Sequence, residues 1–292
     1  TFTVAIVREF SYRKAIDWSH LKSLTIGDVY LNEHDGIFIP HWLQRCSALT
    51  TTDAFGRIPL SGEAWAVARR CQHINLSLLN KNLASFENVG VELSKCTQLK
   101  TLGFSFNFQM IQESPGSVQM ALRALSGLTA LNVSCNYTVQ DNLPVLMEAW
   151  HASLGTLQVL NLSNMVIQEK TFRLLGENLS LCDNLRDLNL SKTCMCDRDI
   201  EAFLHGLRGG AGPRPVLTKL THLRISENPL LSQISSTASV TDLVSSLPSL
   251  THVEMRESIT PGLFVAMGNC SWISRLQHFE AAWSFFWRED AQ

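Results

Sequence analysis

The string L-T-A-L-N-V-S-C-N at residues 128–136 recurs along this chain and decides its fold. Close copies are L-K-T-L-G-F-S-F-N from residue 99, L-Q-V-L-N-L-S-N-M from 157, L-R-D-L-N-L-S-K-T from 185 and L-T-H-L-R-I-S-E-N from 220. Successive copies start 28 or 29 residues apart, except for 35 residues before the last one. Five consecutive matches to one nine-residue template indicate a chain built from structural repeats.

Weaker copies of the template extend the array in both directions and bring it to about ten repeats. They lie at 21–29, 46–54, 71–79, 250–258 and 276–284. In L-x-x-L-x-L the second and third leucines are two residues apart, so both face the core while the residue between them points to solvent. Each copy therefore predicts a short β-strand.

Apolar residues at helical spacing predict a helix after many of these strands. The expected helices cover residues 82–96, 117–125, 168–180, 197–207 and 240–247. Asp197 and Thr241 are of the residue types that cap helix N-termini, and we expect them to do so. Alternating strands and helices predict an α/β fold with a parallel sheet.

The template and its period resemble the leucine-rich repeat, and the length of 28 to 29 residues with a helical second half resembles the ribonuclease-inhibitor-like subclass. The resemblance covers nearly all of residues 21–284. It implies a leucine-rich-repeat solenoid (horseshoe) of about ten repeats, with the parallel β-sheet on the concave face and helices on the convex face. The ninth template position can hydrogen-bond backbone where the strand turns away, and in the family it forms a ladder. Its polar members here are Asn107, Asn136, Thr193 and Asn228.

The repeats predict one leucine-rich-repeat domain over residues 1–292. Within it, 1–20 is an N-terminal flank or cap, 21–284 holds the repeats and 285–292 is a C-terminal tail. The long interval contains G-G-A-G-P-R-P at 209–215, a composition that predicts a surface loop. The aromatic residues near the C-terminus, Trp283 among them, are expected to cover the open core of the last repeat.

Composition and charge exclude several classes of protein. Lys and Arg number 24 against 26 Asp and Glu, for a net charge of −2, which disfavours nucleic acid as a partner. No apolar run approaches the roughly 20 residues of a membrane-spanning helix. The N-terminal ten residues have no basic lead-in and do not read as a signal peptide, so a leader has been removed or the chain is a fragment. We expect an intracellular protein, cytoplasmic or organellar.

The eight cysteines are scattered along a long chain, which favours free thiols in a reducing compartment over a disulfide framework. Cys46 and Cys71 replace the first leucine of their repeats and Cys96 ends a helix, so all three are expected in the core. Cys194-Met-Cys196 lacks a second pair of ligands at zinc-finger spacing. We expect no metal site and no cofactor. Sequons such as Asn136-Tyr-Thr are mostly the repeat template itself.

Aligned in columns, the templates show which side chains leave the core on the exposed face of the sheet. Small and amide residues fill the central repeats, and charge gathers in the last four. The residues that we expect to bind a partner on the concave face are Asp187, Asn189, Lys192, His222, Arg224, Glu227, His252, Glu254, Arg256, Glu257, His278 and Glu280. Phe106 and Trp283 are candidate aromatic anchors.

Two interpretations of this face stay open at the level of sequence. The charges can form ion pairs with a partner, or they can neutralise one another across neighbouring strands. Likewise, His222, His252 and His278 share one column, where they can form a ladder that binds metal or responds to pH, or a solvated polar row.

The chain lacks a phosphate-binding loop, a G-x-S-x-G elbow and an H-E-x-x-H helix, so we expect no enzyme and no small-molecule substrate. The expected function is a non-catalytic protein–protein interaction or scaffolding module within a larger intracellular complex. One alternative is a regulator of a small GTPase of the activating type, because one branch of the family has that activity. Another is an extracellular receptor ectodomain.

Overall fold

The computed structural model describes residues 17–24, 43–53, 60–77, 86–107, 111, 113–136, 143–209, 216–228, 231, 236–258, 265, 267–268 and 270–281. The chain forms two compact units, Thr1–Val159 (unit 1) and Leu160–Gln292 (unit 2). Most of the predicted 209–215 loop, Trp283 and the 285–292 tail lie outside the described residues.

Ten short strands follow the order of the sequence, and the neighbours within each unit pair in parallel. They are β1 (Ser23–Leu24), β2 (Thr51–Thr52), β3 (His73–Asn75), β4 (Thr101–Gly103), β5 (Ala130–Asn132), β6 (Val159–Asn161), β7 (Asp187–Asn189), β8 (His222–Arg224), β9 (His252–Glu254) and β10 (His278–Glu280). Each strand falls on one predicted copy of the template. The α/β leucine-rich-repeat solenoid of about ten repeats is confirmed.

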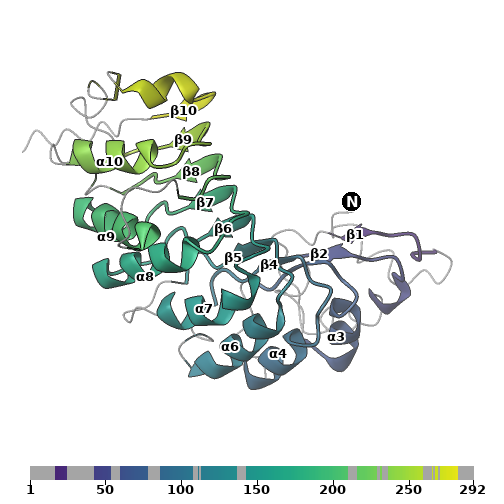
Figure 1. Ribbon diagram of the computed structural model, residues 1–292. Coiled ribbons are helices and arrows are strands. Elements are labelled where there is room, and N and C mark those ends of the chain that lie inside the picture. The colour runs from purple at the N-terminus through teal and green to yellow at the C-terminus, as the bar shows by residue number, and fades with distance from the viewer. Residues whose placement is uncertain are drawn as a thin grey trace, which may run out of the picture. The chain divides into compact units, whose positions relative to one another are not determined.

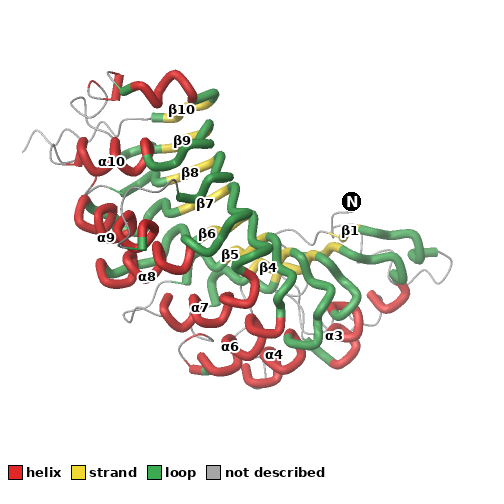
Figure 2. The backbone as a smooth tube through the Cα atoms, viewed as in Figure 1, coloured by secondary structure: helices red, strands yellow, loops and turns green. Residues whose placement is uncertain are grey.

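In each unit the described helices lie on one side of the strands, and no helix among the described residues covers the other side of the sheet (Figures 1 and 2). They are α3 (Gly62–Ala68), α4 (Phe86–Leu93), α6 (Pro115–Ala124), α7 (Leu143–Trp150), α8 (Glu169–Leu179), α9 (Asp197–Arg208) and α10 (Ser236–Ser245), with short 3-10 helices at His151–Ser153 and Ser271–Arg275. We call the side of the sheet without helices the open face.

Alternation along each strand builds the core. In β7 the side chain of Leu188 is fully buried, while Asp187 and Asn189 on either side are half-buried on the open face. Leu188 pairs in register with Leu223, which pairs with Val253, so one buried row crosses unit 2. Leu102 and Leu131 form the same row in unit 1. The sequence template therefore predicted the core register correctly.

The polar ladder at the ninth template position is confirmed in both units. In unit 1 the Asn107 side-chain amide donates to the Leu76 carbonyl (2.9 Å), and the backbone N–H of Asn107 donates to Asn136 Oδ1 (2.6 Å). In unit 2 Asn228 Nδ2 donates to the Leu190 and Ile225 carbonyls (3.0 and 2.9 Å). These side chains satisfy buried backbone groups where the chain leaves the strand.

Both predicted helix caps, Asp197 and Thr241, are wrong. Helix α9 begins at Asp197, and its cap is Cys196, whose N–H donates to the Asp199 carboxylate (2.8 Å). The carboxylate of Asp199, in the first turn of α9, therefore accepts the backbone N–H of the capping residue. Thr241 lies inside α10, because that helix already runs from Ser236.

The three cysteines expected in the core are buried. Burial raises the pKa of the Cys46 and Cys71 thiols to about 11 and that of Cys96 to about 12, so all three are protonated at neutral pH. Within the described parts of the chain, no helix has the length and apolar character needed to cross a membrane.

Candidate functional site: the open face of strands β7–β10

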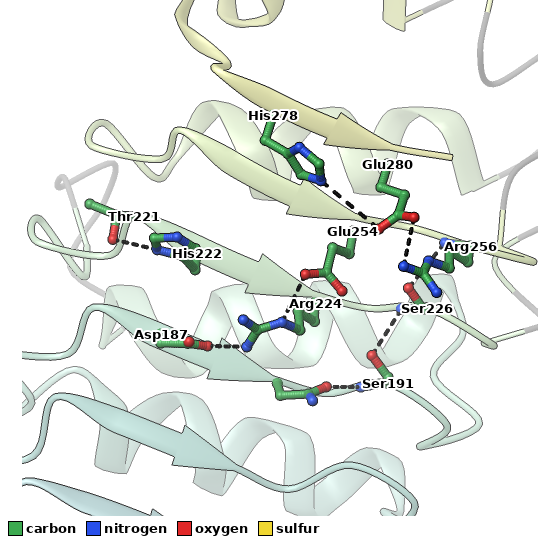
Figure 3. Close-up of polar contacts among 11 residues, drawn as sticks. Asp187, Ser191, Thr221, His222, Arg224, Ser226, Glu254, Arg256, His278 and Glu280 are labelled. Atoms are coloured by element: carbon green, nitrogen blue, oxygen red, sulfur yellow. Dashed lines mark hydrogen bonds and ion pairs between the residues drawn. The ribbon is translucent and has the colours of Figure 1, made fainter. Parts of the chain in front are cut away.

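The twelve residues expected to bind a partner lie on β7 to β10 or in the turns that directly follow these strands. The repeat template puts them in four adjacent columns, because each strand exposes alternate residues on the open face. Figure 3 shows how the central members come together from neighbouring strands. We refer to this set as the charged face.

Arg224 on β8 is the centre of the charged face. Its guanidinium donates to Asp187 Oδ1 on β7 (2.5 Å) and to Glu254 Oε1 on β9 (2.9 Å). Burial by itself lowers the pKa of Arg224, but the two carboxylates outweigh it and raise that pKa. The half-buried guanidinium of Arg224 thus bridges three strands, and its two ion pairs fix the orientation of the Arg224 side chain.

Two further ion pairs flank this centre. Arg256 contacts the Glu280 carboxylate (2.6 Å), which lowers the pKa of Glu280, and Lys192 contacts Glu227 (2.8 Å). In both pairs the cation is exposed and the glutamate is half-buried. In this structure the opposite charges neutralise one another across strands, one of the two arrangements left open by the sequence. Glu257 is exposed on the turn after β9.

The residues at the eighth template position have an unexpected backbone conformation. In six consecutive repeats this position has a φ between 55° and 59°, in the left-handed region. Its residues are Phe106, Cys135, Asn164, Lys192, Glu227 and Glu257. Only asparagine among them favours this region, so this backbone conformation could hardly be predicted from the residue types. The turn directs these side chains outward, and Phe106, a candidate anchor, is 46% exposed.

The three histidines stack. The ring centroids of His222 and His252 are 4.1 Å apart with planes at 16°, and those of His252 and His278 are 5.8 Å apart at 25°. Nδ1 of His222 lies 2.9 Å from the hydroxyl of Thr221, and Nδ1 of His252 lies 2.9 Å from that of Thr251. Burial, followed by the neighbouring His252, lowers the pKa of His222.

The threonines of this stack were missed by the sequence reading. Each one directly precedes its histidine in a recurring Leu-Thr-His string, at residues 220–222 and 250–252. That recurrence was the available signal.

The open face of unit 1 looks different in the same columns. Asn75 and Asn132 each accept the backbone N–H two residues further on, at 2.9 and 3.0 Å, and the hydroxyls of Ser105 and Ser134 are 2.9 Å apart. Gly103 interrupts the asparagine column because a Cβ there would lie 2.4 Å from Asn75 Oδ1. These asparagine and serine side chains therefore form hydrogen bonds within the protein itself.

Asn189 on the charged face behaves like the asparagines of unit 1, because its Oδ1 accepts the N–H of Ser191 (2.9 Å). Ser191 Oγ accepts the N–H of Ser226, and Ser226 Oγ accepts the N–H of Arg256, at 3.2 and 3.0 Å (Figure 3). The serine column therefore supports the turn on which Arg256 stands.

The charged face offers ion pairs and hydrogen bonds rather than a reacting group. In the ranges that the structure describes, no three His, Cys, Asp or Glu side chains are placed to hold a metal ion. Cys194 is exposed and Cys196 caps α9.

Comparison with known proteins gives similarity of structure and not of sequence. No protein-family model matches the chain, and no curated protein is detectably similar in sequence. Among solved structures, the chain is similar to TLR13 in its complex with ssRNA13 (14% identity, TM-score 0.48, 82% of this chain and 37% of that chain). It spans little more than a third of that chain.

Two further solved structures are similar over most of this chain. One is the leucine-rich repeat-containing protein LegL7 from Legionella pneumophila, with 16% identity, a TM-score of 0.44 and coverage of 81% of this chain and 73% of that one. The other is an internalin from Listeria monocytogenes, with 14% identity, a TM-score of 0.43 and coverage of 82% and 69%.

Proposed function

We propose that this chain is a non-catalytic protein-interaction module whose partner binds across the charged face of strands β7–β10. One observation carries the proposal. Among the described residues of the open face, the ion pairs and the stacked histidines lie on β7–β10 and the turns that follow them, whereas the equivalent asparagines of unit 1, Asn75 and Asn132, accept from their own backbone.

The ion pairs of the charged face favour recognition because they are already oriented. Arg224 is held between Asp187 and Glu254, so a partner that adds a further charge need not order a long side chain first. Complementary charges across an interface contribute chiefly to specificity and to the rate of association.

We further propose that the chain is a structural or recognition subunit of a larger intracellular complex. We also propose that its repeats belong to the ribonuclease-inhibitor-like subclass, because their period is 28 to 29 residues and α8, in the repeat that starts at residue 157, has 11 residues.

The test is affinity purification from the native source with the full chain as bait. A partner recovered with the wild type is then compared with Arg224→Gln/Arg256→Gln, in which both guanidiniums of the charged face are lost. The control is Arg173→Gln/Arg198→Gln, which removes two exposed arginines from α8 and α9 with the same change in net charge.

We expect the first pair of substitutions to change capture, because Asp187, Glu254 and Glu280 then lose their cations, and the control pair to leave it unchanged. Equal capture by all three proteins would overturn the proposal that this face binds the partner. Faster GTP hydrolysis by a GTPase recovered in this way would instead support the regulatory alternative.

A further inference from the structure

The hydroxyls of Thr221 and Thr251 determine where the histidine protons lie. Thr221 Oγ1 is 3.1 Å from the Arg186 carbonyl, and Thr251 Oγ1 is 3.3 Å from the Thr221 carbonyl. A carbonyl oxygen only accepts, so each hydroxyl proton points toward it. The hydroxyl oxygen is then the acceptor for the neighbouring histidine, whose Nδ1 must carry a hydrogen.

In the neutral imidazoles of His222 and His252, a hydrogen on Nδ1 leaves Nε2 with a free lone pair. The edge of the stack is therefore an acceptor edge at neutral pH. Because His222 and His252 lie opposite each other on successive parallel strands and their rings stack 4.1 Å apart, their two acceptor edges lie side by side. The third ring of the stack, His278, has its Nε2 3.9 Å from the Glu280 carboxylate.

The charged groups around the stack also favour a partner that donates hydrogen bonds. His222 faces Asp187 from β7, Arg224 from β8 and Glu254 from β9, and His278 faces Glu280. On the charged face the carboxylates are Asp187, Glu227, Glu254, Glu257 and Glu280, and the cations are Lys192, Arg224 and Arg256, each of which contacts a carboxylate. The carboxylates still outnumber the cations when exposed Arg186, which directly precedes β7, is included.

We propose that the stacked histidines and the surrounding carboxylates form a docking site for a cationic, donor-rich segment of a protein partner, and that protonation of the stack closes this site. The proposal rests on the proposed function and deepens it by naming the chemistry of the partner. A guanidinium or ammonium group of the partner can donate hydrogen bonds to the Nε2 atoms and to the carboxylates.

Protonation reverses both properties of the site. An imidazolium has a hydrogen on each nitrogen, so its Nε2 becomes a donor and the ring becomes a cation. Rings 4.1 Å apart also repel each other once both are charged. The lowered pKa of His222 places its protonation below the ordinary value of 6.5, so we expect the site to be open at neutral pH and to close in acid.

The first experiment reads the tautomers directly, without a partner. Long-range ¹H–¹⁵N NMR at about pH 7.5 should show His222 and His252 protonated on Nδ1, against the Nε2–H form usual for exposed histidine. Thr221→Val and Thr251→Val remove the acceptors and should restore the Nε2–H form. Nε2–H tautomers in the wild type would overturn the acceptor-edge argument.

The second experiment measures binding of a fluorescent peptide of alternating glycine and arginine, and of its glycine–glutamate counterpart. Between about pH 7.5 and about pH 5.5 the wild type should lose about tenfold in affinity for the arginine peptide, equal to ~1.4 kcal/mol. Replacement of His222, His252 and His278 by glutamine should abolish that pH dependence. The control is His73→Gln in β3, where Nδ1 lies 2.8 Å from Thr101 Oγ1 in the same column of unit 1. The His73→Gln variant should retain the pH dependence of peptide binding.

Charge is separated from position by a second matched pair. Glu254→Gln/Glu257→Gln should weaken binding of the arginine peptide, whereas Glu169→Gln/Glu201→Gln on α8 and α9 should not, although the net charge changes equally. No binding at about pH 7.5, or stronger binding of the glutamate peptide, would overturn the inference. If capture of the partner from the native source still changes when Arg224 and Arg256 are replaced, the proposed function survives that result.

Discussion

The open faces of the two units differ although the units share one repeat. In unit 1, the side chains of Asn75 and Asn132 accept from their own backbone, as Asn189 still does on β7 of unit 2. In the last three strands of unit 2 the same column holds Arg224, Glu254 and Glu280, which pair across strands. Below both faces lie the same buried leucine rows and the same polar ladder. Core and ladder positions are thus constrained by the repeat, while the exposed columns are free to acquire function.

The largest expected effect tests the shared core. Leu131→Ala in unit 1 and Leu188→Ala in unit 2 each leave a cavity in a fully packed row, and each should lower the free energy of unfolding by ~2–5 kcal/mol. We propose that residues 1–292 unfold as one domain, so each substitution should shift the whole urea transition. Two separate transitions, each moved by one substitution only, would show instead that the units unfold independently.

A somewhat smaller effect is expected in the ladder. Asn136→Ala removes the side-chain donor to the carbonyls of Phe104 and Val133. Asn228→Ala removes one donor each from the carbonyls of Leu190 and Ile225, which keep the hydroxyls of Thr193 and Ser258. Each substitution should cost about 1–3 kcal/mol, measured by urea unfolding. Phe104 is buried, so an unchanged stability of Asn136→Ala would mean that water reaches its carbonyl.

The histidine stack should make stability depend on pH in unit 2. The folded pKa of His222 is below its ordinary value of 6.5, so the unfolded chain binds more protons there and stability falls as pH drops below 6.5. His222→Gln should flatten this part of the curve of unfolding free energy against pH, and His73→Gln should not. A profile that is the same in the wild type and His222→Gln would contradict the assignment.

The smallest effect on stability is expected from Arg224→Gln/Arg256→Gln. Partly exposed ion pairs contribute little, so the melting temperature should change only slightly, in line with less than about 1 kcal/mol per pair. Glutamine is preferred to a charge reversal, because a carboxylate at 224 would lie between Asp187 and Glu254. A large fall in melting temperature would show that the pairs hold the sheet together.

The sequence predicted the fold through its leucines, whose spacing fixes strand register, and the ladder through Asn107, Asn136 and Asn228. It left the charges undecided, because column position alone does not say whether Arg224 bonds a neighbour or a partner. The left-handed turn at Lys192, Glu227 and Glu257 follows from the backbone of the repeat, and no glycine at these positions indicates it in the sequence. The Cys196 cap was missed because Asp199 contributes the bond from inside the helix.

The most direct test of the central claim is side-chain footprinting of the purified partner complex, with the histidines as paired reporters on the two open faces. The account predicts that His222, His252 and His278 lose reactivity when the partner binds, while His73 on β3 of unit 1 keeps it. Protection of His73 with unchanged reactivity at the three stacked histidines would contradict it.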